Sequence, residues 1–313
     1  MTFAEIVKTT NAYKIMAGEK RNDVLSHAYL IICDDGKALR DYLKIFAKLI
    51  MCDGDEFCGE CRTCRLIDKE VYPDCTFYPQ EKDKILVSDI DDLVSQTYVR
   101  PLENKRRLFV LCGAENMNTS AQNKLLKTLE EPPENVVILM GATSEYPLLA
   151  TIKSRVKKLE IPPIHSEILF DVLKSELTDE DRLKRAIALS GGRVGEAISS
   201  YNSGKGEELF IKCRKILNEM KTSRDVLSFV GDIDKDDISD FITAMKIEAG
   251  EIQRRIIREN VKEINGYTVG ALVAIEELLD KKCDALNFNA NGNMTIDRIL
   301  LGILEEKHKW QQL

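Results

Sequence analysis

Short apolar runs alternate with helical segments over the first half of this chain, and this alternation limits the possible folds more than any other feature. Runs of this length, bounded by Gly, Pro and Asp residues, are typical of buried strands. Strands separated by helices predict a parallel sheet that is covered on both faces. We therefore expect an α/β domain with a five-stranded parallel sheet. The strand-like runs are 27–33, 75–79, 84–87, 106–112, 135–142 and 156–161.

Segments between these runs have apolar residues at helical spacing. The first, 37–52, follows the run at 27–33 directly and completes a strand, turn and helix unit. Ser88 to Asp91 resembles a capping box with an acid in place of Glu or Gln, which predicts a helix from there to about Val99, ended by Arg100-Pro101. A further helix is expected over 118–130, where Pro132-Pro133 stops it.

The pattern changes at Pro162-Pro163, after which no strand-like run of comparable strength follows. We expect helices at about 165–174, 179–190 and 193–201, and longer amphipathic helices from 206 onward, including 236–261 and 271–286. The predicted organisation is an α/β domain (1–163), a small helical lid (164–205) and an all-helical C-terminal domain (206–313).

Composition narrows the function classes. The 313 residues carry a net charge of −7, whereas a protein that binds nucleic acid alone usually has a basic balance, so we expect any DNA to be contacted mostly by partners. No stretch approaches the roughly 20 apolar residues of a membrane span, and the N-terminal residues lack an apolar signal core. The predicted location is cytoplasmic.

Four of the nine cysteines crowd between positions 52 and 64: Cys52, Cys58, Cys61 and Cys64. Two C-x-x-C steps in one loop can supply the tetrahedral ligands that Zn²⁺ needs, and four protein ligands leave no open position, so we expect a structural site. Cys52 ends an apolar helical segment and is the weakest member. If it is only a core residue, the fourth ligand is Cys75, a histidine or water.

The remaining five cysteines fall mostly in apolar runs, where a free cysteine behaves as a small buried hydrophobic residue. They are Cys33, Cys75, Cys112, Cys213 and Cys283.

A phosphate-binding loop is expected between the first strand and the first helix of such a fold, with the pattern G-x-x-x-x-G-K-[ST]. The matching stretch is 33–40. Cys33 and Ala38 occupy the glycine positions, Leu39 the lysine position, and Arg40 the position of the hydroxyl that holds Mg²⁺. The groups that would cradle a triphosphate are therefore missing.

Two further observations point the same way. Asp34 and Asp35 lie where the phosphates would bind and would repel them, and rescue by Lys37 would require a shift of register. Active ATPases carry Asp-Glu after the strand that corresponds to 106–111, whereas this chain has Cys112-Gly-Ala-Glu115. Because two parts of one site are lost together, we expect no ATPase activity from this chain.

Several longer blocks, in this order along the chain, resemble the AAA+ clamp-loader subunits, most closely the delta-prime family. The blocks are LSHAYL (25–30), the cysteine module, AQNKLLKTLEEPP (121–133), LATIKSRV (149–156) and LSGGRVGEA (189–197). The match covers 25–197, and 206–313 fits the family's helical collar by pattern only. In this family the cysteine module usually has a longer gap before its second cysteine.

The resemblance implies a role for Arg155. Ser154-Arg155-Val156 corresponds to the family's Ser-Arg-Cys element, whose arginine projects into the ATP site of the adjacent subunit as a finger supplied in trans, with Ser154 in support. Without that context Arg155 would be one more cation among its lysine neighbours. The family's nucleotide-sensing lid arginine falls at Gly195, and Arg193 reads as a solvated residue at a helix start.

The resemblance also implies partners. The expected function is that of a non-catalytic clamp-loader subunit of DNA polymerase III, assembled with gamma/tau ATPase subunits and the delta subunit, which helps load the sliding clamp on primed DNA. The alternative is an ATP-hydrolysing gamma/tau-type subunit, which Leu39, Arg40 and Cys112 oppose. A third reading, a zinc-dependent DNA-binding regulator, conflicts with the acidic balance and the lack of an arginine-rich helix.

Overall fold

The computed structural model describes residues 2–80, 84–234, 237–286 and 292–311. The chain forms two compact units, one made of Met1–Ser175 with Gly192–Glu196 and the other of Glu176–Gly191 with Ala197–Leu313. None of the described helices has the length and apolar character needed to cross a membrane. The three-part division at 163 and 205 stays a prediction.

The first unit contains a five-stranded sheet in the order β2-β3-β4-β1-β5. Every neighbouring pair is parallel, with Tyr29 of β1 opposite Leu139 of β4 and Phe77 of β2 opposite Val110 of β3. The parallel five-stranded α/β domain predicted from the sequence is therefore confirmed. The strands are β1 (Ala28–Cys33), β2 (Cys75–Tyr78), β3 (Arg107–Cys112), β4 (Val136–Ala142) and β5 (Lys157–Ile161).

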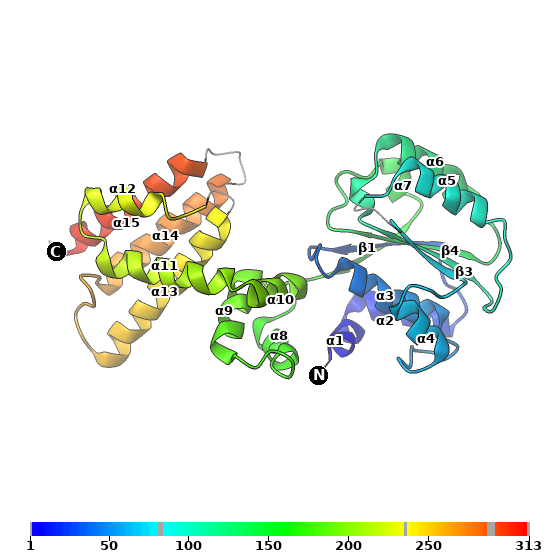
Figure 1. The fold of residues 1–313 in the computed structure, drawn as a ribbon, viewed down its shortest axis with the longest axis horizontal. Coiled ribbons are helices and arrows are strands. Elements are labelled where there is room, and N and C mark those ends of the chain that lie inside the picture. The colour runs from blue at the N-terminus through cyan, green and yellow to red at the C-terminus, as the bar shows by residue number, and fades with distance from the viewer. Residues whose placement is uncertain (1, 81–83, 235–236, 287–291, 312–313) are drawn as a thin grey trace. The chain divides into compact units, whose positions relative to one another are not determined.

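Helices cover both faces of this sheet (Figure 1). One face carries α1 (Phe3–Thr9), α2 (Asn11–Arg21), α3 (Leu39–Met51) and α4 (Arg62–Asp68), and the other carries α5 (Val87–Gln96), α6 (Thr119–Glu130) and α7 (Ala150–Lys153). A separate apolar core fills each side, with Phe46 fully buried in one and Leu125 in the other. Because strands covered on both faces bury every side chain, their sequences read as continuous apolar runs.

One predicted strand is wrong. Residues 84–87 form no strand; Ile85, 2% exposed, leads into α5, which begins at Val87. A four-residue apolar run does not distinguish a strand from the start of a helix. The predicted cap is also misplaced, because the Asp89 carboxylate accepts a hydrogen bond from the Leu86 amide at 2.7 Å. The helix ends at Gln96 rather than near residue 99.

The N-terminal helices were not predicted, although the sequence carries a signal for them. The Thr2 amide donates to Glu5 Oε2 at 2.7 Å and the Glu5 amide donates to Thr2 Oγ1 at 3.3 Å, which together form a capping box at the start of α1. Thr10 then caps α2 by accepting from the Tyr13 amide.

The rest of the described chain is helical, as predicted. The short helix α8 (Ser166–Leu173) belongs to the first unit and α9 (Glu180–Ser190) to the second, while α10 (Val194–Ser203) begins in the first and ends in the second. The predicted helix at 236–261 is α13, although residue 236 lies outside the described residues. The remaining helices are α11 (Lys205–Glu219), α12 (Ser223–Val230), α13 (Ile238–Glu259), α14 (Val269–Leu286) and α15 (Gly292–Gln311).

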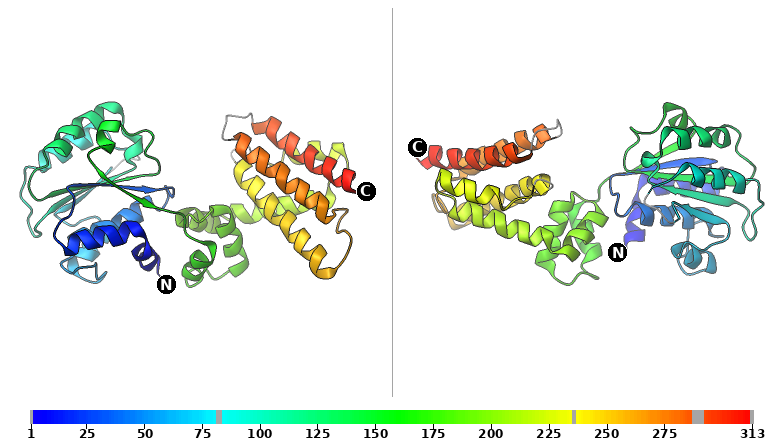
Figure 2. Two further views of the ribbon diagram at one scale, coloured as in Figure 1. Left: turned by 180° about the vertical axis from the view of Figure 1, so that it is seen from behind. Right: turned by 45° about the horizontal axis from the view of Figure 1, so that its top comes forward.

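Helices α11 to α15 pack as a bundle in the second unit (Figure 2). Their shared core buries aromatic residues completely or nearly so, among them Phe210, Phe241 and Tyr267. No strand of a sheet occurs in the described part of the chain after Ile161, where the only pairing is an isolated bridge between Ile264 and Tyr267.

Candidate metal centre and nucleotide loop

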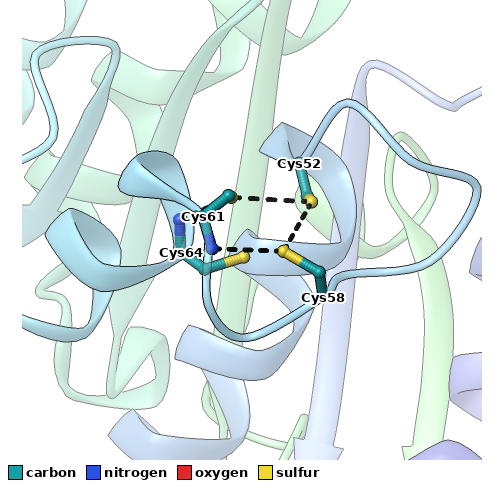
Figure 3. A group of neighbouring side chains, drawn as sticks. All are labelled: Cys52, Cys58, Cys61 and Cys64. Atoms are coloured by element: carbon teal, nitrogen blue, oxygen red, sulfur yellow. Dashed lines mark hydrogen bonds between the residues drawn. The ribbon is translucent and has the colours of Figure 1, made fainter.

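The four clustered cysteines meet in space between α3 and α4 (Figure 3). Their sulfur atoms all lie within 4.8 Å of one another, and Cys52 Sγ lies 3.9 Å from both Cys58 Sγ and Cys61 Sγ. A tetrahedral site with metal–sulfur bonds of about 2.3 Å has sulfur–sulfur edges of about 3.8 Å. The cluster is therefore consistent with a structural metal site.

Local structure explains why these side chains converge. Cys52 follows the last residue of α3, and its amide still donates to the Lys48 carbonyl at 3.0 Å. Cys61 is the N-cap of α4. Between them Gly59 has a φ of +80°, a left-handed conformation that glycine adopts without strain and that turns the chain back toward Cys52.

Backbone amides also point at the sulfur atoms. The Cys61 amide donates to Cys58 Sγ at 3.2 Å, and the Cys64 amide donates to Cys61 Sγ at 3.4 Å. The first of these bonds is the main cause that lowers the pKa of the exposed Cys58 to about 6, because a donor stabilises the thiolate. Burial raises the pKa of Cys64 instead. The amides thus favour the thiolate form that a metal requires.

Lys20 is a further residue of this site that the sequence analysis missed. Its ammonium group donates to the Leu49 carbonyl at 2.7 Å and to the Cys52 carbonyl. Carbonyls at the C-terminal end of a helix have no amide partner within the helix. Lys20 therefore caps the end of α3 and fixes the position of Cys52. Lys20 is 29 and 32 residues away from these two partners in the sequence, so no local pattern could predict the contacts.

Cys75, which the sequence left open as an alternative fourth ligand, lies outside the cluster. Cys75 is buried in β2 among the core residues beneath α3 and is not part of the four-sulfur cluster. Burial raises its pKa, as it does for Cys33 and Cys213. Cys33, Cys75 and Cys213 are buried as predicted, whereas Cys112 and Cys283 are half-buried.

The loop at 33–40, which corresponds to the phosphate-binding loop in the sequence analysis, is held by hydrogen bonds to one of its own carboxylates. Asp35 is 2% exposed, and its carboxylate accepts from the Gly195 amide at 2.7 Å and from the Ala38 amide at 3.3 Å. Burial raises the pKa of Asp35, and the two amides oppose this shift. A carboxylate thus accepts from the Ala38 amide at the start of α3, the end of a helix at which a phosphate binds in an active loop.

Gly195 is required by this contact. A Cβ atom at this position would come within 2.7 Å of both the Ala38 nitrogen and Asp35 Oδ1. Two ion pairs flank it: Lys37 Nζ lies 2.8 Å from Glu196, and the Arg193 guanidinium, just before α10, lies 3.4 Å from Asp34. Lys37, which the sequence analysis considered as a replacement for the missing phosphate-binding lysine, is thus paired with a carboxylate.

Leu39 and Arg40 are also engaged within the fold. Leu39 is 2% exposed and packs in the core beneath α3. The Arg40 guanidinium forms a two-pronged ion pair with Glu70, with Nε 2.8 Å from Oε1. This pairing lowers the pKa of Glu70.

At the end of β3, Gly113 has a φ of +77° and Glu115 turns toward β4. Its carboxylate oxygen Oε1 accepts from Thr143 through both the amide, at 3.1 Å, and the hydroxyl, at 2.7 Å. Oε2 is buried without a hydrogen-bond partner among the described residues. Glu115 therefore links two strand ends instead of standing directly after the strand.

Arg155 follows α7 and lies beside the C-terminal end of α6. Its Nη2 is 2.7 Å from Glu130 Oε1, and its Nη1 donates to the Thr151 carbonyl at 2.8 Å and to Ser154 Oγ at 3.2 Å. The side chain keeps a third of its surface exposed. Arg155 and Ser154 are thus in contact. The ion pair of Arg155 with Glu130 was not expected from the sequence.

This chain is similar to several known proteins. The family described as DNA polymerase III, delta subunit, matches residues 8–165. The delta-prime subunit of Haemophilus influenzae DNA polymerase III is 34% identical over 196 residues, which is 60% of this chain and 58% of that protein. The tau subunit of Bacillus subtilis is 24% identical over 287 residues, or 90% of this chain and 47% of that protein. A gamma-subunit-related protein of Thermotoga maritima has 20% identity and a TM-score of 0.43, covering 93% of this chain and 99% of that one.

The fold and the cluster define an α/β domain with a parallel five-stranded sheet and an inserted four-cysteine module. The chain belongs to the delta-prime family of DNA polymerase III, within the AAA+ clamp-loader subunits. This confirms the resemblance found in the sequence. The chain matches 58% of the length of the Haemophilus relative.

Proposed function

We propose that this chain is a non-catalytic clamp-loader subunit that supplies Arg155 to the ATP site of a neighbouring gamma/tau-type subunit. The observation that carries this proposal is the family match over 8–165, which includes the Ser154-Arg155 element. The loader would place the sliding clamp on primed DNA for the replicative polymerase.

The surroundings of Arg155 suit a group supplied in trans. Its guanidinium is partly exposed and already held by the Thr151 carbonyl, so little side-chain freedom remains to be lost on binding. Glu130 lies at the C-terminal end of α6, where a carboxylate is disfavoured by the helix dipole, so it depends on Arg155 for compensation. A phosphate would replace Glu130 as the anionic partner and would meet the same planar fork.

The absence of catalysis by this chain rests on the loop at 33–40. Phosphate binding there would require Asp35 to give up two buried backbone amides, and Leu39 and Arg40 provide neither the lysine nor the hydroxyl. The loop's own carboxylate already neutralises the amides that an anion would need.

We propose Zn²⁺ as the metal of the cysteine cluster. Cys52, Cys58, Cys61 and Cys64 would hold it, and four thiolate ligands leave no position for substrate. When bound, the ion contributes stability and no chemistry. The two N–H···S contacts and the Lys20 cap would hold the thiolates in place around it.

The helical second unit provides the proposed assembly surface. We propose that its helices form the collar through which the chain joins gamma/tau and delta subunits, as the family relation suggests. Contact with the sliding clamp and primed DNA would then occur through the whole complex.

The test is to reconstitute a loader with Arg155→Ala and to measure DNA-stimulated ATP hydrolysis and clamp loading separately. An arginine finger is typically worth about 10³–10⁵ in rate at its own site. Only one site faces this chain, so total hydrolysis should fall in part while clamp loading falls further. Arg155→Lys should restore little, because an ammonium cannot form the two-pronged contact.

Lys153→Ala is the matched control, since it removes a neighbouring cation of the same segment and should leave both rates within about twofold. Normal rates in both assays for Arg155→Ala, in a complex of normal composition, would remove the finger role and leave a structural subunit.

The alternative, an ATP-hydrolysing gamma/tau-type subunit, draws support from the likeness to a tau subunit over 90% of the chain. Equilibrium dialysis of the isolated chain with Mg-ATP separates the two. We expect no measurable binding; tight binding would favour the alternative.

A further inference from the structure

We propose that a cavity of about 490 Å³ at the N-terminal ends of β3 and β4 binds a phosphate group. The cavity lies between the segment that follows α5 and the segment that follows α6, away from the cysteine cluster and from the loop at 33–40. Its cationic lining residues are Arg100, Lys105 and Arg107, and its one carboxylate is Glu134. Three positive charges thus face one negative charge in a chain whose net charge is −7.

Arg107 is the central observation. It is only 8% exposed, and no carboxylate among the described residues lies within ion-pair distance of its guanidinium. Its Nη2 donates to Gln96 Oε1 at 2.7 Å, and Nε is buried without a partner. The nearest acid in this network, Asp92, is reached only through Gln96, whose Nε2 donates to Asp92 Oδ2 at 2.6 Å.

A buried charge that lacks an opposite charge costs several kcal/mol, so charged groups at such depth are normally paired. Arg106 provides the contrast within one residue, because its guanidinium pairs with Asp23 at 2.5 Å and it does not line the cavity. The cavity beside Arg107 is where a compensating anion fits. Guanidinium groups meet phosphate oxygens through two parallel hydrogen bonds, which favours a phosphate over a spherical anion.

The other two cations converge on the same cavity. Arg100 and Lys105 are exposed, and neither forms an ion pair with any described residue. They would add positive charge from exposed positions of the lining, whereas Arg107 is its buried cation. Tyr98, 76% exposed, also lines the cavity and offers an aromatic face beside the phosphate position. Such a face can stack on a nucleic-acid base, so the phosphate could come from free phosphate or from a single strand.

The first measurement is calorimetric titration of the full chain with inorganic phosphate at constant ionic strength. We expect saturable binding at one site, weakened at least about tenfold in Arg107→Met, since a hydrogen bond to a charged group is worth that much or more. Arg106→Met is the matched control and should bind within about twofold of the unmodified chain. Lys105→Met, at an exposed position that cannot disturb the core, should weaken binding by a smaller factor.

The second measurement separates the two sources of phosphate. If a short oligothymidylate competes with phosphate, and Tyr98→Ala weakens the oligonucleotide about tenfold without affecting phosphate, the site binds single strands. If phosphate binds and the oligonucleotide does not, the site serves free phosphate. The proposal would be overturned if the unmodified chain showed no saturable phosphate binding. It would also be overturned if folded Arg107→Met and Lys105→Met bound phosphate as tightly as the unmodified chain.

Discussion

The cysteine cluster and the loop at 33–40 lie on the same α/β unit at opposite ends of α3, yet they use their polar groups in opposite ways. In the cluster, four sulfur atoms lie within 4.8 Å of one another, and two backbone amides donate to two of them. In the loop, the Asp35 carboxylate accepts from the Ala38 amide of the loop and from the Gly195 amide of α10. The cluster is consistent with a metal site, whereas the amides beside the loop are already paired with a carboxylate of the loop.

The two regions differ in what their backbone amides contact. The Ala38 amide at the start of α3 has no partner within the helix and requires an acceptor. Asp35 supplies that acceptor, while Leu39 and Arg40 are absorbed by the core and by Glu70. The cluster has no such substitute, so its sulfur atoms are expected to depend on a metal.

The largest expected effect is loss of the metal in Cys61→Ser. Structural zinc in finger peptides is worth about 10–16 kcal/mol apparent, so this variant should lose zinc and several kcal/mol of unfolding free energy. Elemental analysis and chemical denaturation measure the two. Cys283→Ser, half-buried in the helical unit, is the control that should keep its zinc. No zinc in chelator-free preparations of the unmodified protein would contradict the comparison.

Next comes Leu39→Lys, which restores the lysine of the phosphate loop. Since Leu39 is 2% exposed, the substitution should cost about 2–5 kcal/mol, as for loss of a buried leucine, and should bring no ATP binding. Thermal unfolding and dialysis with Mg-ATP give the two results. Recovery of tight ATP binding by this single change would show that the loop is only one residue away from function.

A smaller effect is expected in the pH dependence of Asp35→Asn. The pKa of Asp35 is raised in the folded state, so the folded protein binds this proton more readily and stability falls as pH rises through the folded pKa. Compared with Asp35→Asn, the unmodified chain should therefore gain stability as pH falls from 7 toward 4.5. Denaturation curves of both proteins across that range test the sign, and a constant difference would contradict it.

Glu70→Gln should show a pH dependence of similar or smaller size and of the opposite sign. Arg40 holds the pKa of Glu70 below its usual value, so the carboxylate stabilises the fold above the unfolded pKa and loses that effect as pH falls through the folded pKa. The unmodified chain should exceed Glu70→Gln by about 1 kcal/mol at pH 7, and the difference should shrink below about pH 4. Equal differences at both pH values would mean that the ion pair contributes nothing to stability.

Much of the fold could be predicted because its signals are local. The apolar runs became β1, β2, β3, β4 and β5, and the two-residue spacing brought Cys58, Cys61 and Cys64 together at the start of α4. The run at 84–87 failed because four apolar residues fit a helix start equally well, and there the buried Ile85 packs without a strand partner.

The sequence by itself determined the parallel α/β unit, the helical remainder, the cysteine module and the missing lysine and hydroxyl of the phosphate loop, because each depends on residues close together in the chain. Only the tertiary structure decided that Gly195 meets Asp35 and that Arg155 pairs with Glu130. These contacts join segments whose separation is set by packing between elements. No periodicity or spacing in the sequence records such a contact.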